Sequence, residues 1–254
     1  MLWVYLDLPF TIVVEGPLHI GTGYDWGLIH RTVVRDVKGN VYIPGSSLKG
    51  KVRNICENLA KVAGLRVCGA PQPGMMCGGH LAERCIICRI FGTPGDSVPD
   101  GRQLFWYDAH LVSEWIEATV PYGRPIIQTM TRTQVQLSRV RGMAAEERLY
   151  TSEFTIRGLE FEGRVAGWLQ TTPCSVGKGF YEVSLLLAGL RLVETLGGAK
   201  SRGAGRCRIE LPEELIVKAK GKANPEKYTV KELLAATEWL GLFTEEKKES
   251  TIRN

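Results

Sequence analysis

Five side chains of types that commonly bind metal ions crowd into one segment of this sequence: Cys68, Cys77, His80, Cys85 and Cys88. Cys85 and Cys88 have the CxxC spacing of a zinc knuckle, in which a short loop lets two thiolates reach one ion. Cys68 and Cys77 can complete a closed tetrahedral site, with His80 as a substitute for either of them. The segment 64–102 is dense in Gly, Pro and Cys, so we expect it to bury little apolar surface and to fold around a structural Zn²⁺. A thioredoxin-like redox pair is the rival interpretation, but it needs a strand-to-helix context that we do not expect in this loop.

The composition narrows the class of protein. The 7 cysteines are an odd number, which favours reduced thiols and metal binding over disulfides and predicts a cytoplasmic protein. The first residues lack the basic start and apolar run of a signal peptide, and no window is apolar and long enough to span a bilayer, so we expect no membrane partner. The net charge of +5 is a modest excess, so a nucleic-acid surface would have to come from local clusters of cations.

The first cluster of cations opens a predicted helix from Ser47 to about Val62. Pro44 and Gly45 end an extended run, Ser46 or Ser47 can cap the helix, and Lys49, Lys51 and Arg53 follow. Cations at this end oppose the helix dipole, and a backbone phosphate would relieve the conflict by binding both the free N–H groups and the basic side chains. The alternative is a solvated basic face.

A second cluster lies in the glycine-rich run 197–206, which contains Lys200, Arg202 and Arg206. Glycines let backbone N–H groups approach a phosphate, and the cations add charge. The spacing is not that of a P-loop. The alternative is a plain glycine cap at the end of a helix, at Gly197 or Gly198.

A third cluster spans residues 119–150, where Arg132, Arg139 and Arg141 lie among further arginines, glutamines and β-branched residues with little helical or strand periodicity. Such a segment suits a surface that follows a nucleic-acid backbone, and a solvated loop is the alternative.

Hydrophobic patterning supplies the elements that would position these clusters. We expect strands at 3–15, 104–112, 153–169 and 207–211, a short hairpin from 29–36 and 40–43, helices at 47–62 and 177–196, and a short helix near 231–242. Cys56 falls near the apolar face of the first helix and is expected to be a core thiol. The order strand, helix, strand, strand, helix, strand predicts an α+β fold with a ferredoxin-like βαββαβ core, to which the hairpin, the cysteine-rich insertion and the arginine-rich segment are additions.

The stretch IPGSSLKGKVR at residues 43–53, preceded by TVVRD and followed by CRIFG, resembles the RAMP superfamily of CRISPR-associated RNA-binding proteins. Within it, the sequence is most similar to the repeated backbone subunit of type III effector complexes. The resemblance implies one RNA-recognition-type RAMP domain over residues 1–254, with a zinc-binding insertion at 68–102, a β-hairpin thumb at 119–150 and a C-terminal extension at 213–254. Some members carry similar zinc fingers just ahead of an FG pair like Phe91-Gly92.

The same resemblance implies partners and roles for the cationic segments. The glycine-rich loop of RAMP proteins packs near the guide RNA, and the thumb inserts into the guide–target duplex and kinks it. An apolar thumb tip, Ile126-Ile127 or Met143 in this sequence, could wedge between bases. The implied partners are guide RNA, target RNA and other CRISPR effector subunits.

His30 decides whether the resemblance extends to cleavage. In the target-cleaving members an aspartate lies six residues before the acidic residue matched here by Asp36, and that position holds His30. The simplest inference is loss of target cleavage. A histidine could instead take a proton from a ribose 2′-OH without any metal, with Arg31, Lys49 or Lys51 stabilising charge on the phosphate.

Three functions therefore stay open at this point. The first is a guide-RNA-binding backbone subunit with RNA contacts at Ser46, Ser47, Lys49, Lys51, Arg53, Arg132, Arg139, Arg141, Lys200, Arg202 and Arg206. The second is a metal-independent endoribonuclease that matures precursor guide RNA with His30 as general base and Arg31 and Lys51 as its electrostatic partners. The third is a structural subunit that caps the complex and makes few RNA contacts.

Overall fold

The structure is a computed structural model that describes residues 1–254 except 26, 70–71, 79–82, 94–103, 121–123, 138–143, 175–178, 222–223 and 236–254. The helices are α1 (Gly45–Val62), α2 (Ile86–Phe91), α3 (Ser113–Glu117), α4 (Tyr181–Arg191) and α5 (Val230–Ala235), with 3-10 turns η1 (Pro73–Met75) and η3 (Lys200–Arg202). The strands are β1 (Leu2–Val14), β2 (Tyr42–Ile43), β3 (Leu104–Trp106), β4 (Ala109–Leu111), β5 (Thr119–Val120), β6 (Arg124–Pro125), β7 (Thr129–Leu137), β8 (Ala144–Thr155), β9 (Glu160–Thr171), β10 (Cys207–Glu210), β11 (Glu214–Ala219) and β12 (Glu226–Thr229).

One antiparallel sheet carries the fold. Its strand order is β12-β11-β1-β9-β4-β2, with β10 also paired to β1 and β3 to β9. The long strand β1 pairs with β9 along one edge, while its other edge pairs with β11 at Val4–Leu6 and with β10 at Thr11–Val14. Alternate residues of β1, including Val4, Leu6 and Leu8, are fully buried on one face of the sheet, as the period of two in a half-buried strand requires.

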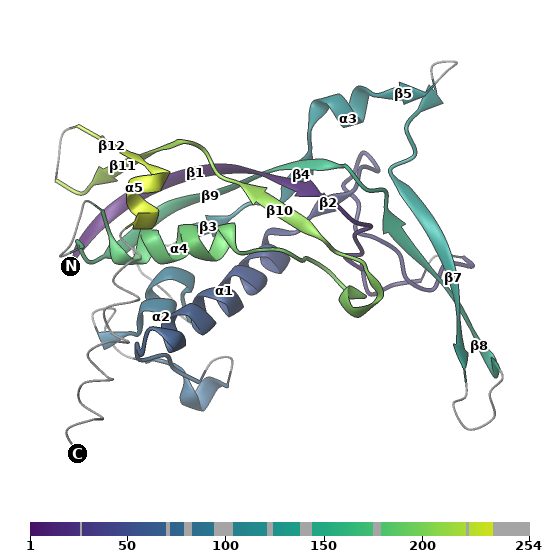
Figure 1. The fold of residues 1–254 in the computed structure, drawn as a ribbon, viewed down its shortest axis with the longest axis horizontal. Helices are drawn as coiled ribbons and strands as arrows, with labels where there is room; N and C mark the ends of the chain where they lie inside the picture. The colour runs from purple at the N-terminus through teal and green to yellow at the C-terminus, as the bar shows by residue number, and fades with distance from the viewer. Residues whose placement is uncertain are drawn as a thin grey trace.

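The helices α1, α2 and α4 lie together on that buried face (Figure 1). Helix α1 buries Leu48, Val52, Cys56 and Ala60, so the predicted apolar face and the core thiol are confirmed. Val62, in the last turn of the helix, is 75% exposed. No helix of the described residues is long and apolar enough to cross a lipid bilayer.

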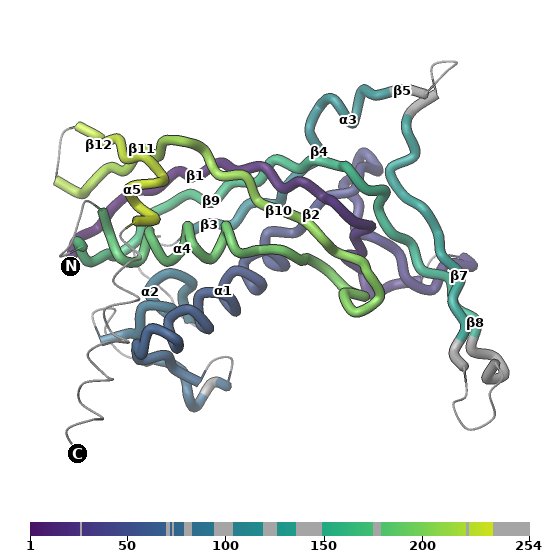
Figure 2. The backbone as a smooth tube through the Cα atoms, in the orientation of Figure 1, coloured from purple at the N-terminus to yellow at the C-terminus, as the bar shows by residue number. Residues whose placement is uncertain are grey.

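Strands β7 and β8 form a separate two-stranded hairpin that projects from the sheet (Figure 2). Thr129 pairs with Thr155, and the register continues through Gln134 and Tyr150. A hairpin is therefore present where the sequence showed little periodicity, although it runs from 129 to 155 rather than from 119 to 150. Met130 to Thr133 of β7 are exposed in succession, on both faces of the strand, so this part of the hairpin needs no apolar alternation.

Several predicted boundaries are wrong. The strand expected at 153–169 is the end of β8, a turn, and β9. The helix expected at 177–196 is α4, which already ends at Arg191. The residues expected to form a hairpin before α1 share a single bridge, Arg35 to Val41, and β2 pairs with β4 instead. The C-terminal segment extends the sheet through β11, and α5 covers only the first part of the helix predicted near 231–242, whose remainder lies outside the described residues.

The insertion is also more buried than its composition indicated. Ile86, Ile87, Ile90 and Phe91 of α2 are all buried in the main core. These apolar residues occupy one short stretch, so the average composition of the segment conceals them.

Two glycines of α1 give opposite expectations for the same substitution. A Cβ on Gly45 would lie 2.2 Å from the carbonyl oxygen of Trp106, whereas a Cβ on Gly50 would meet nothing within 4 Å. Gly50→Ala is expected to raise the free energy of unfolding by about 0.5–1 kcal/mol through helix propensity. Gly45→Ala is expected to lower it by more than ~2 kcal/mol, because backbone must move. Urea unfolding of both variants checks this, and equal effects would contradict the close packing of the helix start against β3.

Candidate metal centre and basic surface

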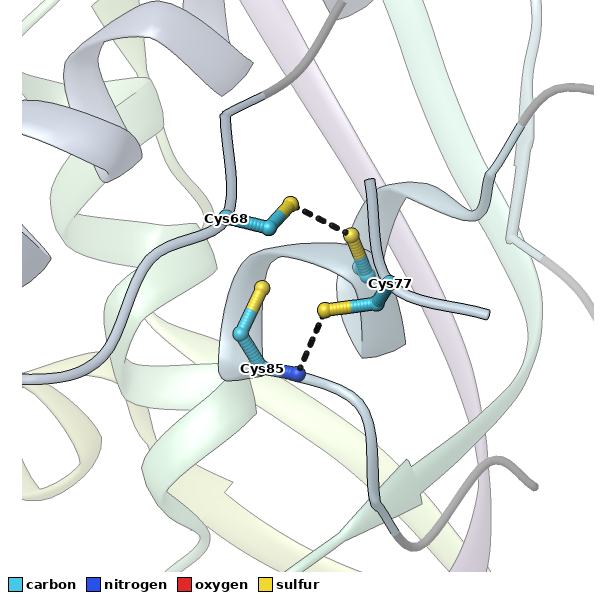
Figure 3. A group of neighbouring side chains, drawn as sticks. Cys68, Cys77 and Cys85 are labelled. Carbon is cyan, nitrogen blue, oxygen red and sulfur yellow. Dashed lines mark hydrogen bonds between the residues drawn. The ribbon is translucent and has the colours of Figure 1, made fainter. Parts of the chain in front are cut away.

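The four cysteines Cys68, Cys77, Cys85 and Cys88 bring their sulfur atoms within 4.8 Å of one another. Zinc–sulfur bonds of ~2.3 Å in a tetrahedron place sulfur atoms ~3.8 Å apart, so a cluster of this size fits one ion. The Cys68 and Cys88 sulfurs are 3.3 Å apart, and Figure 3 shows Cys68, Cys77 and Cys85 turned toward a common centre. The group could hold a metal ion with four thiolate ligands. His80 lies outside the described residues.

Three segments bring these cysteines together. Cys68 follows the end of α1, Cys77 follows η1, and Cys85 is the N-cap residue of α2 and donates its backbone N–H to the Cys77 sulfur at 3.4 Å. The expectation that the CxxC pair lies in a loop is therefore wrong, because the pair opens a helix. A helix start favours thiolate formation, although the residues just before it, Glu83 and Arg84, are not a strand.

The packed thiols have strongly divergent acidities. A hydrogen bond from the Cys88 thiol lowers the pKa of Cys85 to about 4. The pKa of Cys88 is raised, first by its hydrogen bond to Cys85 and then by burial, and burial also raises the pKa of Cys77. The lowered pKa of Cys85 favours its thiolate, which is the form that binds metals.

Helix α2 is fixed to the core by a buried ion pair. Arg89 binds the carboxylate of Glu182 at 2.8 Å, and the Glu182 side chain is fully buried. Glu182 also accepts a hydrogen bond from the backbone N–H of Thr172 at 2.7 Å. Burial raises the pKa of Glu182, while the hydrogen bond from Thr172 and the charge of Arg89 act to lower it. Removing one partner of such a pair leaves an uncompensated buried charge, so the cysteine segment is coupled to α4 and to the end of β9.

The start of α1 differs from the sequence-based expectation at its cap. Pro44 is the N-cap residue, without a side-chain cap bond, and Ser46 and Ser47 are exposed residues of the first turn. The Gly45 N–H donates to the carboxylate of Asp108 at 2.8 Å. This N–H group was expected to be free to bind a phosphate, but it already has a hydrogen-bond acceptor within the chain.

The three cations of α1 have separate surroundings. Burial, and then the charge of Arg53, lower the pKa of Lys49. Arg53 binds Glu57 at 2.8 Å and the Gly92 carbonyl at 3.3 Å, so its guanidinium faces the protein body. Burial, and then the charge of Lys200, lower the pKa of Lys51. Lys51 therefore lies beside the glycine-rich run, which comes from the opposite end of the chain.

Two glycines in that run, Gly197 and Gly205, are required by close backbone packing. A Cβ on Gly205 would lie 2.2 Å from the Leu196 carbonyl oxygen, and one on Gly197 would lie 2.3 Å from the His19 carbonyl oxygen. Neither Gly197 nor Gly198 caps a helix, because α4 ends at Arg191 with Leu192 as its cap. Arg206 is exposed, and its carbonyl accepts from Glu15 and Gly16.

The hairpin meets the glycine-rich run at Arg202. The Arg202 Nη1 atom donates to Gln134 Oε1 at 2.7 Å and to the Tyr150 hydroxyl at 2.8 Å. Arg132 is exposed, with its guanidinium 5.3 Å from the centroid of Phe154. Arg139, Arg141 and Met143 lie outside the described residues. Ile127 is 76% exposed, but it precedes β7 at the base of the hairpin, so Ile126-Ile127 is not a thumb tip.

His30 lies beside the hairpin with one ring nitrogen occupied. Its backbone N–H donates to Thr151 O at 3.0 Å, and the Thr151 N–H donates to His30 Nδ1 at 3.2 Å. A nitrogen that accepts a hydrogen bond carries no proton, so the neutral ring holds its proton on Nε2. The exposed ring therefore presents a hydrogen-bond donor rather than a base. Its neighbour Arg31 lies 5.4 Å from the Tyr150 ring centroid, whereas Lys51 lies beside Lys200.

The structure thus brings Arg31 and Arg202 together at Tyr150 of the hairpin. Lys200 lies in the same 3-10 turn as Arg202, and its charge acts on Lys51, whereas Arg53 is paired with Glu57. Tyr150 was missed from the sequence, because its two arginine partners are 119 and 52 residues away and no spacing rule connects them.

Two curated proteins are similar to this chain over most of its length. The protein is 28% identical over 218 residues to the CRISPR system Cms endoribonuclease Csm3 of Methanocaldococcus jannaschii, covering 80% of each chain. It is 28% identical over 205 residues to the protein of the same name from Streptococcus thermophilus, covering 78% of this chain and 84% of that one.

Two solved structures share the fold. A chain of the type III-B Cmr-beta complex bound to cognate target RNA matches with a TM-score of 0.51 and 15% identity over 81% of this chain and 96% of that one. A chain of the same complex in its apo state matches with a TM-score of 0.52 and 12% identity over the same shares. A sequence model described as the RAMP superfamily matches residues 11–208. With most of its length covered by that match, the chain belongs to the RAMP superfamily.

Proposed function

We propose that this protein is a backbone subunit of a type III CRISPR effector ribonucleoprotein, in which it binds the guide RNA and shapes its duplex with target RNA beside other effector subunits. The observation that carries the proposal is the meeting of Arg31 and Arg202, from distant segments, at Tyr150 of the projecting hairpin. Lys200 adds a cation in the turn of Arg202, and its charge acts on Lys51 of α1. Backbone contacts of this kind leave bases free to pair, so sequence specificity belongs to the RNA.

The proposal includes a ferredoxin-like core. The path β10-β1-β9-β4, with α1 after β1 and α4 after β9, supports this topology, since the first strand lies between the fourth and the third. A free state of all 7 cysteines supports a reducing compartment such as the cytoplasm.

We propose Zn²⁺ as the ion of the four-cysteine group. Cys68, Cys77, Cys85 and Cys88 offer the Cys₄ ligand set of structural zinc sites. Four protein ligands would close the coordination shell, so a zinc here would hold the segment after α1 against α2 and would take no part in cleavage.

A second candidate function is RNA cleavage, because the curated relatives are named endoribonucleases. His30 stands where the family's catalytic aspartate is expected, and the Nδ1 lone pair that a general base would use already accepts the Thr151 N–H. We therefore propose that the chain binds RNA without cutting it.

One experiment tests both functions. A labelled single-stranded RNA with a CRISPR repeat is incubated with wild-type protein and with His30→Ala, with and without Mg²⁺, and run on native and denaturing gels. The wild type is expected to shift the RNA in a salt-dependent manner and to leave it intact in every lane, as is the variant. A discrete product that disappears in His30→Ala would make the protein a nuclease. Absence of a shift at low salt would favour the capping subunit instead.

A further inference from the structure

Tyr150 of β8 touches two guanidinium groups that come from opposite ends of the chain. The Arg202 Nη1 atom donates to its hydroxyl at 2.8 Å, while the Arg31 guanidinium lies over its ring, 5.4 Å from the centroid. Gln134, which is directly opposite Tyr150 in the hairpin register, accepts a second hydrogen bond from Arg202 at 2.7 Å. One side chain thus joins the loop before β2, the hairpin and the glycine-rich run.

The backbone holds both arginines in place. Arg202 ends η3, and left-handed residues bound that turn, Ala199 with φ 58° and Gly203 with φ 78°. The Arg31 carbonyl accepts the Glu153 N–H at 2.8 Å, which fixes the loop against β8. The fold thus fixes the backbone at both arginines, and the contacts with Tyr150 and Gln134 orient their side chains.

Among the described residues, Arg31 and Arg202 contact only neutral groups. An ion pair with a carboxylate is formed by five other arginines: Arg35, Arg53, Arg89, Arg164 and Arg208. Two guanidinium groups held near one ring repel each other, and an anion between them would stabilise both. Planar guanidinium groups bind phosphate with directed, charge-assisted hydrogen bonds.

We infer that Tyr150 is a positioning residue that holds Arg31 and Arg202 on one phosphate of a bound RNA strand. This inference rests on the proposed function and adds a residue that acts through the arginines. The hydroxyl orients Arg202, and the ring supports Arg31 by a cation–π contact. If Tyr150 instead contacted RNA itself, for example by stacking on a base, the loss of RNA affinity on substituting Tyr150 would be independent of whether Arg202 is present.

A double-mutant cycle separates these possibilities. Wild type, Tyr150→Phe, Arg202→Ala and the double variant are titrated with a labelled single-stranded RNA at several salt concentrations. One phosphate contact contributes ~0.7 to the salt slope of single-strand binding, which corresponds to roughly fivefold in affinity at 0.1 M salt. Arg202→Ala is expected to weaken RNA affinity roughly fivefold, and Tyr150→Phe is expected to weaken it about two- to fivefold. The double variant should bind RNA no more weakly than Arg202→Ala alone.

Tyr107→Phe is the matched control. Tyr107 also supports an arginine at 5.4 Å, but that arginine, Arg164, is bound by Asp7, so RNA affinity should not change. Unchanged binding by Tyr150→Phe, or additive losses in the double variant, would overturn the positioning role while leaving the proposed function intact. Salt-independent or absent binding by the wild type would overturn both. Equal melting temperatures of the four proteins show that the losses are not losses of fold.

Discussion

Cys68→Ser is expected to reduce bound zinc well below one ion per chain and to lower the melting temperature by about 8–16 °C. Cys68 is half-buried and lies outside the helices, so serine itself costs little there, and the loss comes from the missing ligand. Structural zinc contributes roughly 10–16 kcal/mol in zinc-finger peptides, and a loss of ~4 kcal/mol corresponds to about 8–16 °C in a chain of this size. Loss of the ion is expected to destabilise the core as well, because the segment that contains Cys68, Cys77 and Cys85 continues into α2. The Ile87 and Phe91 side chains of α2 are buried in the core.

Cys174→Ser is the control for this substitution. Cys174 is also half-buried but lies after β9 and is not one of the four clustered cysteines, and burial raises its pKa to about 11. Zinc content by mass spectrometry and a thermal melt should be close to wild type for Cys174→Ser. Equal zinc content in the two variants would contradict a metal site at Cys68.

Replacing Arg31, Lys51 and Arg202 together with alanine is expected to weaken binding of single-stranded RNA about 100-fold at 0.1 M salt, since three phosphate contacts contribute ~2 units to the salt slope. The slope should become shallower by the same ~2 units, which distinguishes lost phosphate contacts from a general loss of affinity. The three cations come from separate segments, Arg31 and Arg202 meeting at Tyr150 and Lys51 interacting with Lys200 beside Arg202, so no single peptide of the chain would reproduce the effect.

A second triple variant, of Arg164, Arg208 and Lys227, removes the same charge elsewhere. All three residues are exposed and form ion pairs with carboxylates, Asp7, Glu15 and Glu214 among them. Exposed pairs contribute only about 0–1 kcal/mol each, and RNA affinity should change by less than about threefold. An equal loss in both triple variants would show that net charge, rather than the surface beside the hairpin, determines binding.

Local features of the fold were readable from the sequence. The strand β1 and the helix α1 follow from residue types and helical spacing, and both elements were predicted close to their observed bounds. The end of α4 was not, because its apolar run continues beyond Arg191 into Val193 and Leu196, which are buried without being helical. Burial in the tertiary fold, rather than helical periodicity, explains the apolar residues there.

The candidate sites also differ in how far the sequence predicted them. The cysteine group was predicted because its members lie within 21 positions of sequence and thiol chemistry is fixed by residue type. Arg53 was predicted as an RNA contact from its place in the basic cluster. In the structure its guanidinium forms an ion pair with Glu57 and donates a hydrogen bond to the Gly92 carbonyl. A cluster in sequence does not say which way each side chain points, since that depends on neighbours from other elements.

The sequence by itself determined the superfamily, the group of four cysteines that could hold a metal ion, and the presence of three cationic segments. Only the tertiary structure decided that two of those segments meet at Tyr150, and that the Thr151 N–H occupies His30 Nδ1 from 121 residues away. The physical reason is the range of the forces involved. Secondary structure and metal ligation by nearby residues are encoded over a few residues, whereas hydrogen bonds between distant segments exist only after the sheet has brought those segments together.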